Sequence, residues 1–503
     1  MKFKILFLLL FVLTVGVNAQ DATSLQYGKL VSTDDLKEYL SIIASDALEG
    51  RETGTRGQKM AAAFIAAHFQ ELGLAGPVNG SYYQAVELYS RAVSEAYVKA
   101  GETKFDNFSG VVYSGSADTG GEVSLPIVFI GNGTEADLKQ VDIKDKAVFF
   151  FSKETRLTGS KTIAAIREKG AKIIFVCTTE TAADFETLAG QMKNFTSGGR
   201  PSLEKPKDPD NAGLFLVSPV AAEKILGTTL EKLKKAASED PSKNALKKIK
   251  PATVQYKTAT TLKVLKTENV LGYLEGTDKK DELVVITAHY DHIGKLKSGT
   301  GDLINNGADD DGSGTVSVMT IAKAFAQAKK DGKGPRRSIL FMTVTGEEKG
   351  LLGSAYYSEH PIFPLENTVV DLNIDMVGRR DAEHKDSPPF VYVIGSDKLS
   401  AELHTLSESV NKTYTNLVFD YTYNDENHPT NLYKRSDHWN FAKKNIPIIF
   451  YFDGIHEDYH KPSDEVSKIE FDLMTTRARC VFHTAWEIAN RDKRITADPD
   501  KKK

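Results

Sequence analysis

The amino-acid sequence predicts an α/β protein with a mixed, largely parallel central sheet flanked by helices, and a smaller β-rich domain inserted into it. Beyond residue 263, almost continuous apolar runs of strand length, such as residues 283–287, alternate with helical patterns. Strands of this kind are buried on both faces, as in a parallel sheet covered by helices. Before residue 110 the pattern is helical, and a separate series of short β-rich runs lies between these two regions.

The chain has 503 residues, which is too long for one ordinary hydrophobic core, so two or three domains are expected. The expected parts are a signal peptide (1–19), an N-terminal helical part of the main domain (20–110), an inserted domain (111–262), the part of the main domain that carries the candidate site (263–492) and a polar tail (493–503).

Residues 1–19 have the layout of a secretory signal peptide. A basic start, MKFK, is followed by an apolar stretch and by a small-residue cleavage site that ends at Ala19. The apolar stretch is too short for a membrane span, and no later segment approaches the required length. We therefore expect cleavage near Ala19 and a mature protein that is secreted or periplasmic, without a membrane span.

The helical part begins with two segments, 34–45 and 57–74, whose apolar residues have the spacing of amphipathic helices. Because no strand accompanies these helices, we expect them to pack on the later sheet. In the inserted region, runs such as 146–152 and 171–177 predict strands, and helix-like segments separate them.

Composition excludes one class of partner and restricts the metal chemistry. The formal net charge of −4 gives no electrostatic reason to bind nucleic acid. The two cysteines, Cys177 and Cys480, have no metal-type spacing, and we expect each to be buried as a small packing residue. Any metal must then be held by histidine and carboxylate ligands.

Five residues of the types that bind zinc follow apolar runs in the second half of the chain. They are His289, Asp310, Glu348, Asp375 and His460. The carboxyl end of a buried strand is where ligands bind in open α/β sheets. This set is sufficient for two divalent metal ions, and Glu347 remains free as a base. Such a site suits the hydrolysis of an unreactive bond such as an amide.

His289 and Asp291 come directly after the strand at 283–287. Because side chains alternate along a strand, these two share a side, and the competing ligand His292 does not. Asp291 is then placed to orient the imidazole of His289.

The acidic motifs are ambiguous when each is taken alone. Three consecutive aspartates, Asp309 to Asp311, are costly to place together unless cations neutralise them. A solvated turn that caps the next helix is about as plausible, and a calcium loop is weaker because the spacing is not that of an EF-hand. A glutamate pair after a strand, such as Glu347 and Glu348, usually marks the first turn of a helix.

The strand that ends at Asp375 is unusually polar, since Asp371 and Asn373 share its side.

Near the end of the chain, His456 competes with His460. We prefer His460 because Asp464 can support its imidazole and the adjacent Tyr459 presents a phenol. Zinc fits these ligands best, with Mn²⁺ or Co²⁺ as substitutes.

Several short motifs occur together in a recognisable order, namely AHYDHIG, GADDDGSG, TGEEKGLLGS, NIDMVG, RSDH and DYHKPSD. In this order the chain from about 265 to 490 resembles the secreted co-catalytic zinc aminopeptidases, of the bacterial leucyl aminopeptidase and aminopeptidase Y type. The resemblance implies the zinc-aminopeptidase, phosphorylase/hydrolase-like fold. The region 111–262 more loosely resembles the protease-associated domain that is inserted in many of these enzymes.

The resemblance also implies roles for particular residues. Asp310 would bridge two Zn²⁺ ions, with His289 and Asp375 completing one metal site and Glu348 and His460 the other. Further roles would fall to the general base Glu347, the oxyanion donor Tyr459 and the substrate-side Arg435, and Asp309 and Asp311 would be structural neighbours. The substrates would be peptides with a free N-terminus.

Two alternatives stay open. A carboxypeptidase or dipeptidase would use the same metals but would need cations to hold a C-terminal carboxylate, and Arg379, Arg380, Lys434 and Arg435 are candidates. A non-catalytic receptor or binding protein on this fold would be expected to have lost metal ligands, and all five positions are filled here.

Overall fold

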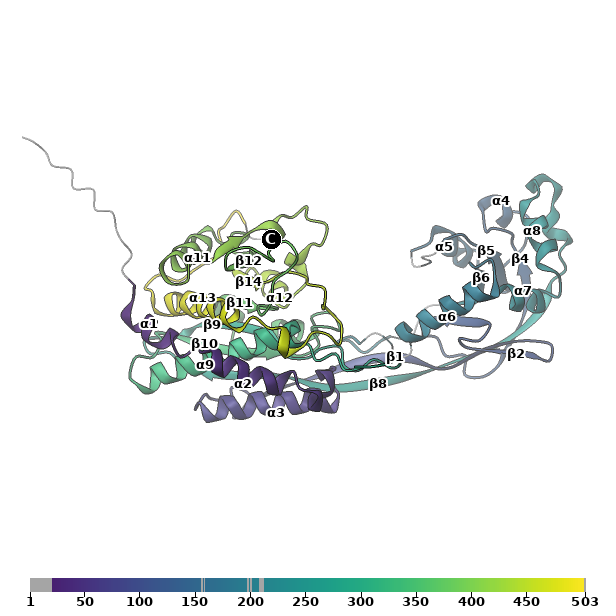
Figure 1. The fold of residues 1–503 in the computed structure, drawn as a ribbon. Coiled ribbons are helices and arrows are strands. Elements are labelled where there is room, and N and C mark those ends of the chain that lie inside the picture. The colour runs from purple at the N-terminus through teal and green to yellow at the C-terminus, as the bar shows by residue number, and fades with distance from the viewer. Residues whose placement is uncertain are drawn as a thin grey trace, which may run out of the picture. The chain divides into compact units, whose positions relative to one another are not determined.

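The fold is described from a computed structural model (Figure 1). The described residues are 20–154, 157, 159–196, 199, 201–207 and 212–501, without the side chains of 194–196. The predicted signal peptide lies outside them. Among these residues, no helix combines the length and the hydrophobicity that a membrane span requires. The chain divides into two compact units, Met1–Val86 with Lys266–Lys503, and Glu87–Leu265.

The first unit is built on a mixed sheet whose central strands run parallel. In spatial order its strands are β13 (Val418–Asp420), β12 (Phe390–Ile394), β14 (Ile448–Phe452), β11 (Thr368–Ile374), β9 (Lys279–His289), β10 (Arg337–Val344) and the end of β8 (Ala252–Leu274). The strands β14, β11, β9 and β10 pair in parallel, whereas β12 and β8 are antiparallel to their inner neighbours. The predicted mixed, largely parallel sheet is confirmed.

Helices cover both faces of this sheet, because side chains along each strand alternate between two hydrophobic cores. In β9, Val284 and Ile286 face one core, and Leu283 and Val285 face the other. The first core includes residues of α1 (Ala22–Gly28), α2 (Thr33–Ile43), α3 (Arg56–Glu71), α9 (Gly314–Lys330), α11 (Ala401–Tyr414) and α13 (Phe471–Asn490). The second includes residues of α10 (Leu352–Glu359) and α12 (His438–Ala442).

The second unit also combines a sheet with helices. Its strands are β1 (Tyr83–Ala100), β2 (Thr103–Asp106), β3 (Val111–Ser114), β4 (Val123–Phe129), β5 (Ala147–Phe151), β6 (Ile173–Cys177) and β7 (Leu214–Val217), together with the first part of β8. Its helices are α4 (Glu135–Leu138), α5 (Lys161–Glu168), α6 (Ala182–Thr196), α7 (Pro219–Leu226) and α8 (Leu230–Ser238). Because β4, β5, β6 and β7 pair in parallel, this unit has its own α/β core.

The boundaries differ from those expected from the sequence in two places. The sequence predicts a helical part as far as residue 110, but β1 begins at Tyr83, where buried and less buried side chains alternate as they do along a strand. The second unit accordingly begins at Glu87 rather than at 111. At the other end, the tail includes a buried apolar residue, Ile495, and Asp498 accepts a 2.9 Å hydrogen bond from the backbone of Ala401.

Candidate metal centre

The candidate ligands meet at the carboxyl edge of the first unit's sheet. His289 is the last residue of β9, Asp375 follows β11 directly, and Glu347 and Glu348 come shortly after β10. The carboxyl ends of parallel strands lie at one edge, so these side chains converge although they are far apart in the sequence.

The first group of donors consists of His289, Asp310 and Asp375, whose ligand-type atoms lie within 4.8 Å of one another. Nε2 of His289 is 3.2 Å from Oδ1 of Asp310 and 3.6 Å from Oδ1 of Asp375. Nδ1 of His289 lies 3.0 Å from the backbone carbonyl oxygen of Asp291. A proton on Nδ1 would satisfy that carbonyl and leave Nε2 free to bind a metal.

Asp291 therefore orients His289 through its carbonyl oxygen, and its carboxylate has other partners. Its Oδ1 is 3.9 Å from Nδ1 of His289, beyond hydrogen-bonding distance. The carboxylate accepts a 2.6 Å hydrogen bond from the hydroxyl of Thr53 and a 3.2 Å bond from the backbone N–H of Glu347. The sequence predicts that the carboxylate itself holds the imidazole, whereas the structure gives this role to the carbonyl oxygen.

The second group forms around the other oxygen of Asp310. Nε2 of His460 lies 3.0 Å from Oδ2 of Asp310 and 3.2 Å from Oε1 of Glu348. Nδ1 of His292 lies 2.9 Å from the same oxygen of Glu348, and His292, Asp310 and Glu348 also form a set of mutually close donors. Asp310 thus directs one carboxylate oxygen to each group.

Strand alternation predicts that His292 points away from His289 and is therefore not a metal ligand. That argument does not apply, because β9 ends at His289 and the chain beyond it no longer has a period of two. The backbone N–H of His292 instead bonds to the carbonyl oxygen of Arg51, which comes from the N-terminal part of the chain.

Asp464 and His456 hold the aspartate loop rather than a metal-facing imidazole. The Asp464 carboxylate accepts 3.1 Å hydrogen bonds from the backbone N–H groups of Asp309 and Asp310. Nε2 of His456 lies 3.1 Å from Oδ2 of Asp309. Asp464 was expected to support His460, but its described contacts are with this loop.

Burial and charge determine how the acidic residues titrate. Burial raises the pKa of Glu347 well above its ordinary value, and the charges of Glu348 and Asp375 raise it further. Burial and the charge of Asp310 raise the pKa of Glu348, but the nearby imidazoles of His292 and His460 outweigh this and lower it to about 2. Glu347 therefore holds a proton more readily than its neighbour does.

Glu347 stands beside the donor groups, and a small cavity opens next to it. Oε2 of Glu347 is 3.9 Å from Nε2 of His289. The cavity is lined by His289, Asp310, Glu347, Asp375, Met376, Leu432, Arg435, Phe450, Phe452, Ile455 and Tyr459. The Tyr459 ring stacks on His460 with 3.9 Å between ring centroids.

The polar residues inside β11 form a buried chain of hydrogen bonds that leads to Asp375. Burial raises the pKa of Asp371 well above its ordinary value, and its Oδ1 lies 2.9 Å from the hydroxyl of Thr287. Thr287 donates to Oδ1 of Asn373 at 2.7 Å, and the Asn373 amide donates to Ser436 at 2.9 Å. Ser436 donates to Asp375, so a residue deep in the sheet is linked to a candidate ligand.

Arg51 joins the N-terminal part of the chain to the loops of this centre. It is fully buried and donates hydrogen bonds to four backbone carbonyl oxygens, those of Ile43, Tyr290, Asn306 and Gly307. The sequence offered no signal for this role, because an isolated arginine in a turn is ordinarily exposed.

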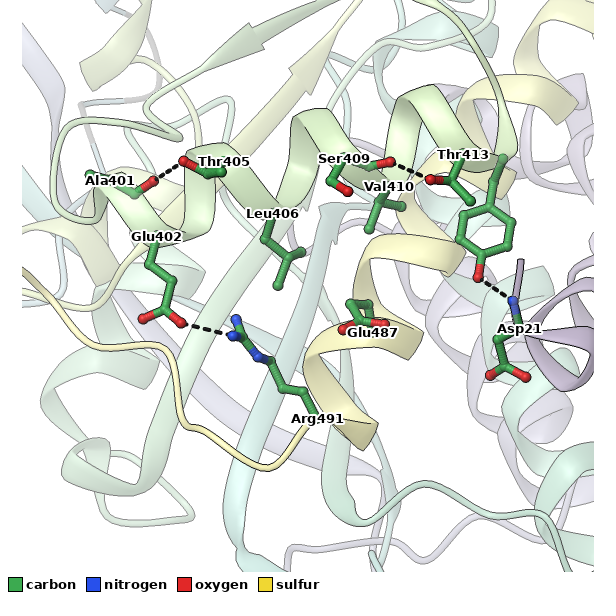
Figure 2. Close-up of a pocket in the computed structure, with 11 residues that line it drawn as sticks. Asp21, Ala401, Glu402, Thr405, Leu406, Ser409, Val410, Thr413, Glu487 and Arg491 are labelled. Atoms are coloured by element: carbon green, nitrogen blue, oxygen red, sulfur yellow. Dashed lines mark hydrogen bonds and ion pairs between the residues drawn. The ribbon is translucent and has the colours of Figure 1, made fainter. Parts of the chain in front are cut away.

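A larger hollow of about 570 Å³ lies elsewhere in the first unit, over α11 and the end of α13 (Figure 2). There Glu402 is paired with Arg491 at 2.8 Å, and the Tyr414 hydroxyl accepts a hydrogen bond from the backbone of Asp21. Its lining contains neither of the two donor groups, so the metal centre is the better candidate for chemistry.

Comparison with known sequences finds similar proteins among the peptidases. The profile of Peptidase family M28 matches residues 269–485. Leucine aminopeptidase 1 of Fusarium vanettenii is 29% identical over 220 residues, which cover 42% of this chain and 54% of that protein. Aminopeptidase YwaD of Bacillus subtilis is 24% identical over 345 residues, covering 62% of this chain and 68% of that one. The chain thus spans about half the length of the Fusarium protein.

Comparison with solved structures shows the fold. An aminopeptidase from Aneurinibacillus sp. strain AM-1 superposes with a TM-score of 0.53 at 18% identity, covering 95% of this chain and 98% of that one. A zinc aminopeptidase from Bacillus subtilis gives a TM-score of 0.51 at 19% identity, with 94% and 99% covered. The predicted resemblance to zinc aminopeptidases is confirmed, and the protease-associated assignment of the inserted domain stays a prediction.

Proposed function

We propose that this chain, which carries a Peptidase family M28 match over residues 269–485, is a zinc-dependent metallo-aminopeptidase that removes N-terminal residues from peptides. The observation that carries the proposal is the position of Asp310. One of its oxygens faces His289 and the other faces His460, at 3.2 and 3.0 Å, as a carboxylate shared by two metal ions would.

The donor set fits two zinc ions. Oδ2 of Asp310 and Oε1 of Glu348 are buried and form no hydrogen bond among the described residues. Carboxylate oxygens in that state are costly unless a cation compensates them. His289, Asp310 and Asp375 would hold one ion, and Asp310, Glu348 and His460 the other. When bound, such ions polarise a carbonyl group and make a water molecule more acidic.

Glu347 is the proposed general base. Its largely buried carboxylate is next to the first donor group without belonging to it, so it stays available to take up a proton. Glu347 would accept a proton from the attacking water and deliver it to the leaving amine. The Tyr459 hydroxyl, in the same cavity, would donate a hydrogen bond to the developing oxyanion.

A carboxylate beside the metals would hold the free α-amino group of the substrate. Asp310, Glu347 and Asp375 line the cavity together with one cation, Arg435. Two other cations that a carboxypeptidase could have used are paired elsewhere, since Arg379 bonds to Asp458 at 3.1 Å and Arg380 to Glu470 at 3.0 Å. The fourth candidate, Lys434, lies over the Trp439 ring at 5.5 Å and does not line the cavity. The carboxypeptidase or dipeptidase alternative therefore depends on Arg435.

Export is part of the proposal. The signal-peptide pattern of residues 1–19 supports cleavage near Ala19 and an extracytoplasmic location. N-terminal sequencing of protein recovered from cells that express the full chain tests it: a mature start at Gln20 supports export, and a start at Met1 contradicts it.

The activity test uses free and N-acetylated aminoacyl anilides, with zinc and then with a chelator. Zinc-dependent cleavage of the free-amine substrates alone supports an aminopeptidase. If a protein that binds two metals cleaves neither set but hydrolyses N-blocked dipeptides, and Arg435→Ala abolishes this, the carboxypeptidase alternative is correct. If it binds two metals and cleaves none of these substrates, the proposed function is wrong.

A further inference from the structure

We propose that His292 is a direct ligand of the second metal ion, so that this ion is held by two imidazoles and two carboxylates while the first is held by one imidazole and two carboxylates. The inference rests on the proposed two-metal function and adds a ligand to it. It concerns Nδ1 of His292, which joins Asp310, Glu348 and His460.

The position of the ring is the first support. Nδ1 of His292 is 2.9 Å from Oε1 of Glu348 and 3.8 Å from Oδ2 of Asp310. Nε2 of His460 approaches the same two oxygens, and the two imidazole rings meet edge to face at 5.7 Å between centroids. Both imidazoles therefore approach the same two carboxylate oxygens, Oε1 of Glu348 and Oδ2 of Asp310.

The lack of other partners is the second support. His292 is fully buried, and neither of its ring nitrogens forms a hydrogen bond with any described residue. By contrast, buried His438 and His68 each place a ring nitrogen near a backbone carbonyl oxygen, at 2.9 and 3.1 Å. A buried imidazole without such a partner is costly, and coordination to a metal ion removes part of that cost.

The surrounding backbone is shaped to admit this ring. A Cβ atom at Gly307 would lie 2.6 Å from Cδ2 of His292, closer than side chains approach one another. Gly307 also has a φ of +56°, which favours glycine. The backbone N–H of His292 is held at 3.1 Å by the carbonyl oxygen of Arg51, so the ring has a defined direction.

The additional imidazole has a consequence for metal selection. Nitrogen ligands favour zinc over manganese and magnesium, which prefer oxygen ligands. The second ion should therefore be bound more tightly, and with a stronger preference for zinc, than the first. Partial removal of zinc should leave a protein with one ion, held at the group that contains His292.

The test measures metal binding by the full chain without reference to catalysis. His292→Phe keeps a ring of similar shape but removes both nitrogens. His292→Asn keeps a hydrogen-bond donor for Glu348 but lacks the imidazole. It replaces His292→Phe in the metal-binding test if the phenylalanine variant does not fold. His68→Phe is the matched control, because it replaces another buried histidine of the same unit. Zinc affinity is measured by competition with a chelator, and Co²⁺-loaded protein is examined by visible absorption.

We expect the affinity for one of the two zinc ions to fall by at least about 100-fold in both His292 variants, because loss of a residue that only supports a ligand costs about 10–100-fold. We also expect the visible absorption of Co²⁺ at that site to change. The control binds both ions as the wild type does. Unchanged affinities and spectra in His292→Phe would overturn the inference. Full recovery in His292→Asn would also overturn it, by showing that His292 only donates to Glu348.

The same preparations separate this inference from the proposed function. A wild-type protein that binds two zinc ions with the expected asymmetry but cleaves none of the peptide substrates refutes the function and leaves the ligand assignment intact. A wild-type aminopeptidase whose His292→Phe variant keeps both ions and both spectra refutes only the ligand assignment.

Discussion

The hydroxyl of Ser436 donates a hydrogen bond of 2.6 Å to Oδ2 of Asp375. The other oxygen of Asp375, Oδ1, faces Nε2 of His289 at 3.6 Å. The protein thus holds one carboxylate oxygen and leaves the second for the proposed metal ion. Ser436 is itself held by the amide of Asn373, so the orientation of Asp375 depends on residues inside the sheet.

Removing this hydrogen bond should weaken the first metal ion. In Ser436→Ala, Oδ2 of Asp375 loses its donor, and we expect zinc affinity at the first group to fall by about 10–100-fold. Ser436→Thr keeps the hydroxyl and should restore most of that affinity. Chelator competition measures both. Wild-type affinity in the alanine variant would show that the hydrogen bond does not position the ligand.

Glu347→Gln should separate catalysis from metal binding. The amide cannot take up the proton, so kcat should fall by about 10²–10⁴-fold. Both zinc ions should remain, because Glu347 belongs to neither donor group. Zinc analysis and anilide hydrolysis test the two expectations, with the exposed Glu359→Gln as control. Near-normal turnover in Glu347→Gln would exclude this residue as the base.

Arg51→Met should destabilise the first unit strongly. Four backbone carbonyl oxygens would lose their donor, and buried groups left without a partner cost about 1–3 kcal/mol each. We expect the free energy of unfolding in urea to fall by at least about 3 kcal/mol. The control is Arg56→Met, whose side chain is 73% exposed and whose loss should cost less than about 1 kcal/mol. Equal effects of the two substitutions would contradict the role of Arg51.

Stability should fall in mild acid because of His483. Burial lowers the pKa of this imidazole to about 4, from an ordinary value of 6.5. Below about pH 6.5 the unfolded chain binds a proton that the folded chain does not, so stability is lost between about pH 6.5 and 4, by about 3 kcal/mol.

Urea unfolding of the wild type and of His483→Gln across that pH range tests this expectation. The variant lacks the titrating group at this position, so its free energy of unfolding should change less with pH than that of the wild type. Parallel pH profiles for the two proteins would show that His483 does not titrate as burial predicts.

Local sequence patterns were sufficient to predict the sheet and the convergence of donor residues. The apolar run of β9 identifies a strand buried on both faces, and His289 at its end identifies the edge. Asp375 follows from the same reasoning on β11. These predictions succeed because strand periodicity depends on neighbouring residues alone, and strands that pair in parallel place their carboxyl ends at one edge.

Contacts made by loops could not be predicted in this way. Asp291 presents its carbonyl rather than its carboxylate to His289, and Asp464 binds the aspartate loop rather than His460. Both depend on how the chain turns after a strand has ended, where no period constrains side-chain direction. The sequence by itself therefore determined which residues reach the sheet edge. Tertiary structure decided which atoms they present, because partners distant in sequence, such as Arg51 for His292, set the path of each loop.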